Sequence, residues 1–380
     1  IQDSYMKKEP QNEEEDSVAF VLFNVKGKDL LAIDQLNDFS DERNPEQARN
    51  DTFAKYEQLG LSAEPFKNVH YYYPCSIPKT RHWNTYMTPE EVEDNIRKKK
   101  AKKYKYIYKY DKDNLDLMFA NIDDSTQTME SIISYIMSGQ GKFNQVNDWQ
   151  EFLEAVKEKC SAETSGKDKE IPVASWRKFY RIINKSIADN KIFARDIRED
   201  EGETRIGDAL KYIKKNDVHV IDIAKLSEDK QAYVFGDAIR TIYDLQLGQY
   251  AGEEGVNPPS RVVIFIDELN KYASKETPKN SPILRQVLDV AERGRSLGVV
   301  LFAAEQFRSA IHDRVTGNCS THAYGRTNSI EVTKSDYKSI PSVYKTMMTR
   351  LKQGEYIIQN PIFRSLLNIK FPKPIYKQFK

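Results

Sequence analysis

Two acidic residues follow directly on an apolar run in the second half of the chain. The run Val262-Val-Ile-Phe-Ile266 ends in Asp267 and Glu268. In open α/β sheets ligands bind at the carboxyl ends of parallel strands, so we expect both carboxylates at such an edge. An aspartate there can hold Mg²⁺, and an adjacent glutamate can polarise an attacking water. The pattern predicts the Walker B part of a nucleotide-hydrolysing site; the alternative is a buried strand with an acidic turn.

Further polar residues accompany the next apolar run. The run 298–302 leads into Gln306, an amide placed to sense a γ-phosphate or, alternatively, a plain surface loop residue. Arg293 and Arg295 precede the same run, in a glycine-containing segment at an expected helix end. Arginine offers a rigid fork of donors that suits phosphate. We expect Arg295, and less so Arg293, to reach a nucleotide on a neighbouring subunit; the alternative is a helix C-terminal cation favoured by the macrodipole.

Apolar runs and helical periodicities alternate along much of the chain. This alternation predicts a doubly wound α/β fold with a parallel sheet covered by helices. From 76 to 215 the signals are mainly helical, which predicts an insertion between the core segments 1–75 and 216–380. The last part predicts a hairpin from Gly354 and an extended arm from Phe371. The expected strands are 18–23, 69–73, 217–223, 262–266, 298–302 and 322–326.

Composition excludes some classes of protein. The 380 residues carry 58 basic and 57 acidic side chains, so net charge gives no argument for nucleic-acid binding. The longest apolar run, 297–304, is too short to span a bilayer, and no signal peptide is recognisable, so we expect no membrane association. The three cysteines are widely spaced, which fits a reducing cytoplasm. The five histidines form no metal-spaced pair, so structural roles are expected for them.

A basic run offers one local candidate for nucleic-acid contact. Arg97 to Lys103 is followed by Tyr104, Tyr106 and Tyr108. Such a run, together with the tyrosines that follow it, can track a phosphate backbone. The alternative is a solvated helix face.

The ordered set of motifs resembles a known family. Segments 265–270, 291–298 and 304–308 are together similar to the HerA/FtsK group of hexameric DNA-pumping ATPases, nearest to its HerA branch. Segments 24–31, 316–321 with Arg326, and the C-terminal hairpin and arm agree with it; the resemblance covers 18–75 and 215–380.

The resemblance implies a RecA-like core and roles for single residues. Asp267 would bind Mg²⁺, Glu268 would be the catalytic base, Gln306 the sensor, and Arg295 the finger acting between subunits. The cofactors would be ATP and Mg²⁺. The assembly would be a homo-hexameric ring, a helicase or translocase that threads double-stranded DNA. Its partner would be a nuclease or other effector in DNA processing or antiviral defence.

One element of the family's pattern is missing. No stretch fits the phosphate-binding loop GxxxxGK[ST], and Lys26-Gly-Lys28 lacks the preceding glycine. Because the chain begins at Ile1, we expect the loop and an N-terminal barrel to lie upstream. The alternative is a ring scaffold that organises an effector enzyme without hydrolysis of its own. A third possibility is a conjugation-type coupling ATPase, which would carry membrane helices upstream.

Overall fold

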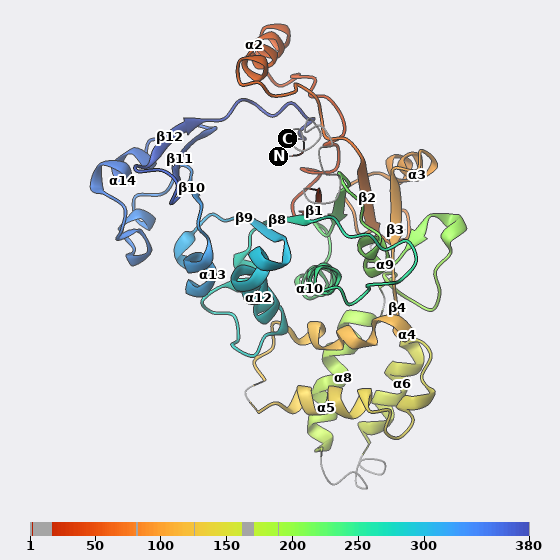
Figure 1. Ribbon diagram of the computed structural model, residues 1–380. Helices are drawn as coiled ribbons and strands as arrows, with labels where there is room; N and C mark the ends of the chain where they lie inside the picture. The colour runs from red at the N-terminus through yellow and green to blue at the C-terminus, as the bar shows by residue number, and fades with distance from the viewer. Residues whose placement is uncertain are drawn as a thin grey trace.

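Seven strands form one parallel sheet at the centre of the molecule (Figure 1). The computed structural model describes Gln2 and residues 17–80, 83–124, 126–161, 171–188 and 190–379. The strand order is β6-β3-β2-β7-β1-β8-β9, and every neighbouring pair runs parallel. The strands are β1 (Val18–Asn24), β2 (Val69–Pro74), β3 (Ala101–Tyr104), β6 (Glu203–Thr204), β7 (Val218–Asp222), β8 (Arg261–Asp267) and β9 (Val299–Ala304).

Helices cover both faces of this sheet, as the sequence predicts, but not equally. β1 is buried along its whole length, which explains its unbroken apolar run. One face packs against α9 (Ile206–Lys211), α10 (Glu228–Gln246) and α12 (Pro282–Leu297). The other face is covered by α3 (Pro89–Arg97) and by the non-helical segment around Leu31 and Ile33. The α/β class and the parallel sheet are therefore confirmed.

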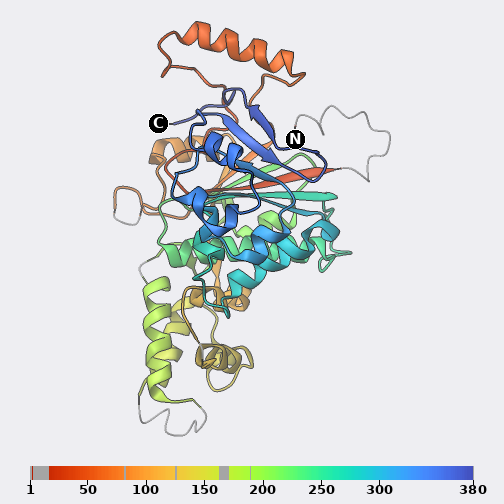
Figure 2. The same ribbon diagram turned by 90° about the vertical axis from the view of Figure 1, so that its left-hand side faces the viewer.

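The helical part of the insertion forms a subdomain below the sheet (Figures 1 and 2). Its core is aromatic, with Trp176, Phe152 and Phe179 fully buried. The range 76–215 also supplies β3 and β6 to the central sheet. The subdomain's elements are β4 (Tyr106–Ile107), α4 (Tyr108–Asp111), the 3₁₀ helix η1 (Lys112–Phe119), α5 (Thr128–Met137), α6 (Trp149–Lys159), α8 (Val173–Ile187) and β5 (Phe193–Ala194).

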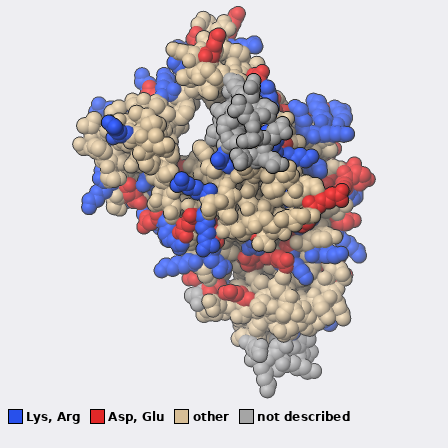
Figure 3. Space-filling model, in the orientation of Figure 1, with Lys and Arg blue, Asp and Glu red and all other residues tan. Residues whose placement is uncertain are grey.

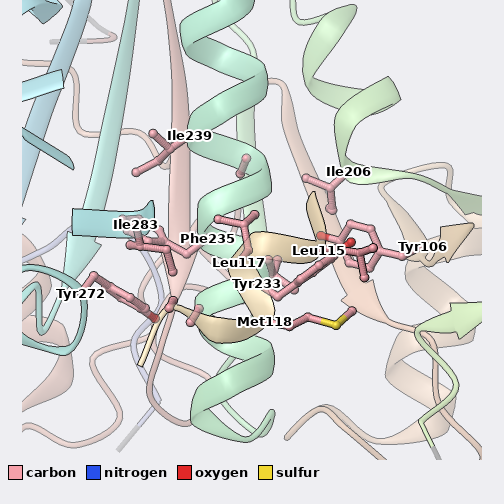
Figure 4. Close-up of a cluster of buried hydrophobic side chains, with 14 of the residues drawn as sticks. Tyr106, Leu115, Leu117, Met118, Ile206, Tyr233, Phe235, Ile239, Tyr272 and Ile283 are labelled. Carbon is pink, nitrogen blue, oxygen red and sulfur yellow. The ribbon is translucent and has the colours of Figure 1, made fainter. Parts of the chain in front are cut away.

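The subdomain is docked on the core through η1 and α10. Figure 4 shows Leu115 and Leu117 of η1 lying against the part of α10 that carries Tyr233 and Phe235. Gly236 permits this approach, because a Cβ there would lie 2.6 Å from the Leu117 side chain. The close packing joins the subdomain and the core into one hydrophobic cluster.

The basic run lies at the sheet and not on a helix face. Arg97 ends α3, and residues 101–104 form β3. Tyr104, Tyr106 and Tyr108 are 0%, 0% and 2% exposed, so these rings are not available to stack on bases, and a contact of the basic run with a phosphate backbone stays a prediction. Their period-two pattern instead places them in the core next to the edge of the sheet. Figure 3 shows a group of lysine and arginine side chains over α3, whereas both signs are interspersed over the rest of this face.

The C-terminal part forms a second, antiparallel sheet beside the core. β10 (His322–Tyr324), β11 (Glu355–Gln359) and β12 (Leu367–Lys370) make up this sheet, with α14 (Ser342–Met348) packed nearby. The hairpin expected from Gly354 is confirmed. The expectation that 322–326 is a strand of the core sheet is wrong, because Tyr324 pairs with Ile357 of the hairpin.

The arm that follows returns to the first part of the chain (Figure 1). It is extended, as expected from Phe371 onward, and Asn37 N donates to Ile375 O at 2.8 Å. Tyr376 packs on Phe66. Helix α2 (Pro45–Gln58) projects away from the sheet near this arm (Figure 2). No helix among the described residues has the length and apolar character needed to cross a bilayer.

Candidate active site

The acidic pair lies where β8 ends. Asp267 is the last residue of β8 and pairs with Ala304 at the end of β9. Glu268 then turns the chain with φ of 59°, a left-handed conformation that is uncommon outside glycine. Its N–H donates to Asp267 Oδ1 at 2.9 Å. The turn leaves the Asp267 side chain 37% exposed and the Glu268 side chain 15% exposed, so the two carboxylates meet different environments.

Two lysines hold the Glu268 carboxylate. Lys26, in the loop after β1, lies 2.5 Å from Oε1, and Lys271 of α11 (Asn270–Ala273) lies 2.7 Å from Oε2. The hydrogen bond from Lys26, followed by that from Lys271, lowers the pKa of Glu268. Glu268 therefore carries its negative charge at neutral pH and can accept a hydrogen bond from water, and the two lysines make it a weaker base than a free glutamate. Each oxygen keeps a further lone pair for water.

A third carboxylate adds to the negative charge at this edge. Asp29 follows Lys26 in the same loop, and burial together with the charge of Asp267 raises the pKa of Asp29 against the opposing effect of Lys26. Lys26 also lies 3.9 Å from Asp267 Oδ2. Carboxylate oxygens are the ligands that Mg²⁺ prefers, and Asp267 is accessible. The residues present thus fit a divalent cation, with Asp267 as its ligand.

A buried polar network supports the neighbouring strand ends. Asp222 ends β7, and its carboxylate accepts from Asn24 Nδ2 at 2.9 Å and from Thr85 Oγ1 at 2.5 Å. The Tyr104 hydroxyl donates to the Asp222 carbonyl at 2.9 Å. Asn24 Oδ1 in turn accepts from Leu30 N, which fixes the loop that carries Lys26. Sequence reasoning missed this network, although Asn24 and Asp222 each end an apolar run.

The network predicts a pH-dependent stability. Burial raises the pKa of Asp222 to about 6. Below that value the folded state retains a proton that the unfolded chain releases near its ordinary pKa of 3.8, so stability falls as pH rises between the two. This effect should lower the free energy of unfolding by about 3 kcal/mol, and Asp222→Asn should abolish it. Urea unfolding of both proteins from about pH 4 to pH 7 measures it; parallel curves contradict the assignment, and Asp123→Asn at an exposed position is the control.

Gln306 lies beyond the end of β9, at the same edge as the acidic pair. Its side chain is exposed, and its backbone N–H donates to Glu305 Oε1 at 2.7 Å. Glu305 Oε2 accepts from Asn270 N at 2.9 Å and so ties the end of β9 to the turn after β8. The structure therefore brings Gln306 to the expected edge, and Glu305 is the positioning residue that sequence reasoning missed.

The two arginines lie at the other edge of the sheet. Arg293 and Arg295 are exposed near the end of α12, which leads into the amino end of β9. Gly298 then packs against the Ser260 carbonyl, just before the start of β8. The structure does not bring these arginines together with Asp267. That Arg295, or Arg293 near it, contacts a nucleotide on a neighbouring subunit stays a prediction.

The last strand of the sheet has a free edge in the part of the chain that the structure describes. There β9 pairs with β8 alone, and Phe302 is 47% exposed in the middle of the strand. The sequence contains no GxxxxGK[ST] loop. The described residues thus place carboxylates at this edge, and the sequence contains no loop of the pattern that would fit the phosphates of ATP.

Comparisons with known proteins give distant structural likenesses. The sequence matches no family model and no curated protein. It is similar to the genome-packaging NTPase B204 of Sulfolobus turreted icosahedral virus 2, at 17% identity over 44% of this chain and 71% of that one, with a TM-score of 0.30. It is also similar to VirB4 of Thermoanaerobacter pseudethanolicus, at 9% identity over 97% of this chain and 84% of that one, with a TM-score of 0.48. The bacterial conjugative coupling protein TrwB is similar at 9% identity over 96% of this chain and 90% of that one, with a TM-score of 0.45.

Proposed function

We propose that this chain carries the hydrolytic half of a ring-forming ATPase of the HerA/FtsK superfamily, which couples MgATP hydrolysis to movement of double-stranded DNA. The observation that carries the proposal is the acidic pair at the carboxyl end of β8, with Glu268 held ionised between Lys26 and Lys271. In this proposal Asp267 binds Mg²⁺ and Glu268 accepts a hydrogen bond from the attacking water. Gln306 senses the γ-phosphate from the end of β9.

The free edge of β9 offers a position for a strand that would carry the phosphate-binding loop. A parallel strand added there would end beside Ala304, one strand away from Asp267, because the carboxyl ends of parallel strands meet at one edge. It would also cover the exposed Phe302. We propose that such a strand, contributed from outside these 380 residues, carries the loop that binds the phosphates of ATP.

The position of Arg295 accounts for the proposed ring. An arginine at the edge opposite its own acidic pair has no phosphate to contact in its own chain, but a head-to-tail neighbour in a closed ring can present one. We propose a homo-hexamer acting in the cytoplasm with a nuclease or other effector in DNA processing or antiphage defence. The free, widely separated Cys75, Cys160 and Cys319 fit that compartment.

One observation favours a second function. Because the sequence lacks a phosphate-binding loop, the chain also fits a ring scaffold that organises an effector enzyme without hydrolysing ATP. The two functions share a fold and an assembly, and they differ in turnover.

A mass measurement and an ATPase assay on the native assembly separate the two functions. In the mass measurement we expect a ring that forms, or binds DNA, only when MgATP is present. In the ATPase assay we expect duplex DNA to raise the rate of ATP turnover. A ring that binds its effector and hydrolyses no ATP, with or without DNA, contradicts the motor and supports the scaffold. Failure to form any ring contradicts both.

A further inference from the structure

A second cluster of ligand-type side chains lies at the opposite edge of the sheet from the acidic pair. His70 is near the start of β2, and Asp217 and His219 flank the start of β7. One nitrogen or carboxylate oxygen from each residue lies within 4.8 Å of the others. The site formed by these three residues shares no side chain with the candidate active site.

Strand register brings the three side chains together. His70 is directly opposite His219 in the parallel pairing of β2 with β7, so both side chains stand on one face of the sheet. Asp217 precedes His219 by two residues and shares its face for the same reason. The carboxylate is fixed, because Asp217 Oδ2 accepts from Lys214 N at 2.9 Å and the Asp217 carbonyl accepts from Phe20 N at 2.9 Å.

The distances suit a bound ion better than direct hydrogen bonds. His70 Nε2 lies 3.7 Å from Asp217 Oδ1, and His219 Nε2 lies 3.6 Å from Asp217 Oδ2. A hydrogen bond between such atoms is normally about 2.7–3.2 Å long. Ligands about 2.1 Å from a tetrahedrally coordinated zinc are about 3.4 Å apart, close to both separations.

His219 supplies an independent sign of a missing partner. The residue is 4% exposed, and neither ring nitrogen has a hydrogen-bond partner among the described residues. Tyr72 stacks on the ring at 5.3 Å between centroids and holds its plane. Buried polar atoms are almost always satisfied, so an unpartnered imidazole facing a carboxylate and a second imidazole indicates a ligand.

Exposure gives an ion a route to the site. The His70 side chain is 43% exposed and the Asp217 side chain 17%, so the cluster opens to solvent on the side away from His219. Two imidazoles and one carboxylate select a zinc-class ion over Mg²⁺ or Ca²⁺, which prefer all-oxygen sites. Three protein ligands leave a fourth position for water.

We propose that His70, Asp217 and His219 bind one zinc-class divalent transition-metal ion that ties the amino end of β2 to that of β7. The ion is structural, because the site is at the amino ends of the strands and the candidate active site is at their carboxyl ends. It fastens β2 to β7, two neighbouring strands that lie about 150 residues apart in the sequence.

The test uses the native protein prepared without a histidine tag and stripped with a chelator. We expect titration calorimetry to give one tight Zn²⁺ site per chain, no comparable Mg²⁺ binding, and a melting temperature that rises with Zn²⁺. Co²⁺ should give the visible absorption of a tetrahedral nitrogen–oxygen site. His70→Ala should weaken Zn²⁺ binding at least about tenfold and abolish the Zn²⁺-dependent shift.

His312→Ala is the matched control, since His312 is also half-buried but caps α13 (Asp313–Asn318) outside the cluster. It should bind Zn²⁺ as the unchanged protein does. Equal Zn²⁺ affinity in the His70→Ala variant overturns the proposal. The proposal is also overturned if His70→Ala lowers the melting temperature equally in chelated and in Zn²⁺-loaded protein. That result would mean that His70 contributes to packing and not to metal binding.

Discussion

Glu268→Gln is expected to lower ATP turnover by the native assembly by about 10²–10⁴-fold, the usual contribution of a positioned general base. The amide keeps the shape of the side chain but loses the charge that polarises water. Lys26 and Lys271, whose side chains are 46% and 33% exposed, remain able to hydrate, so folding and ring formation should persist. Steady-state ATPase kinetics and native mass spectrometry measure the two properties separately.

Glu276→Gln is the matched control for this substitution. Glu276 is an exposed glutamate in the same connection between β8 and α12, and its side chain is not part of the acidic site. The control should turn over ATP at the normal rate. Undiminished turnover by Glu268→Gln contradicts its role as base, whereas loss of the ring in that variant would assign Glu268 a structural role.

The location of the candidate-site residues that follow apolar runs could be predicted from the sequence. Asp267, Glu268 and Gln306 follow apolar runs, and a parallel sheet places the ends of such runs at one edge. Lys26 could not be assigned in the same way, because its contact with Glu268 depends on β1 lying beside β8. Strand order is a long-range property that periodicity does not encode.

The same limit applies to the histidine cluster at the amino ends of β2 and β7. His70 and His219 have no metal-ligand spacing in the sequence, and only the β2–β7 register makes them neighbours. A search for ligand spacing within one segment detects sites built on one helix or turn, and it overlooks sites built across adjacent strands.

Helix α2, which precedes the insertion, and helix α3, near the start of the insertion, are not predicted from the sequence, for different reasons. For α3 the signal was present: Thr88 and Glu91 form a reciprocal capping box around Pro89. For α2 little pattern exists, since Thr52 is its one buried residue and no apolar stripe faces a core. The capping signal could have identified α3, whereas α2 follows from helix propensity and its Asn44 cap.

Gly298→Ala is expected to destabilise the fold by about 2–5 kcal/mol, because two separate costs add. Gly298 ends α12 with φ of 77°, where a side chain is strained. A Cβ there would also lie 2.2 Å from the Ser260 carbonyl oxygen, a backbone atom that cannot move without shifting the start of β8. The free energy of unfolding, from urea titration with an unchanged slope, measures the loss.

Gly252 separates the two costs. Its φ is 86°, but a Cβ there would meet nothing within 4 Å, so Gly252→Ala should lose only about 1–2 kcal/mol. Asparagine tolerates the left-handed region, so Gly252→Asn should lose less than Gly252→Ala, whereas Gly298→Asn should remain as damaging as Gly298→Ala. Equal losses at Gly298 and Gly252 would contradict the close approach. That approach sets where α12 ends, and so where Arg295 stands relative to β8 and to any neighbouring subunit.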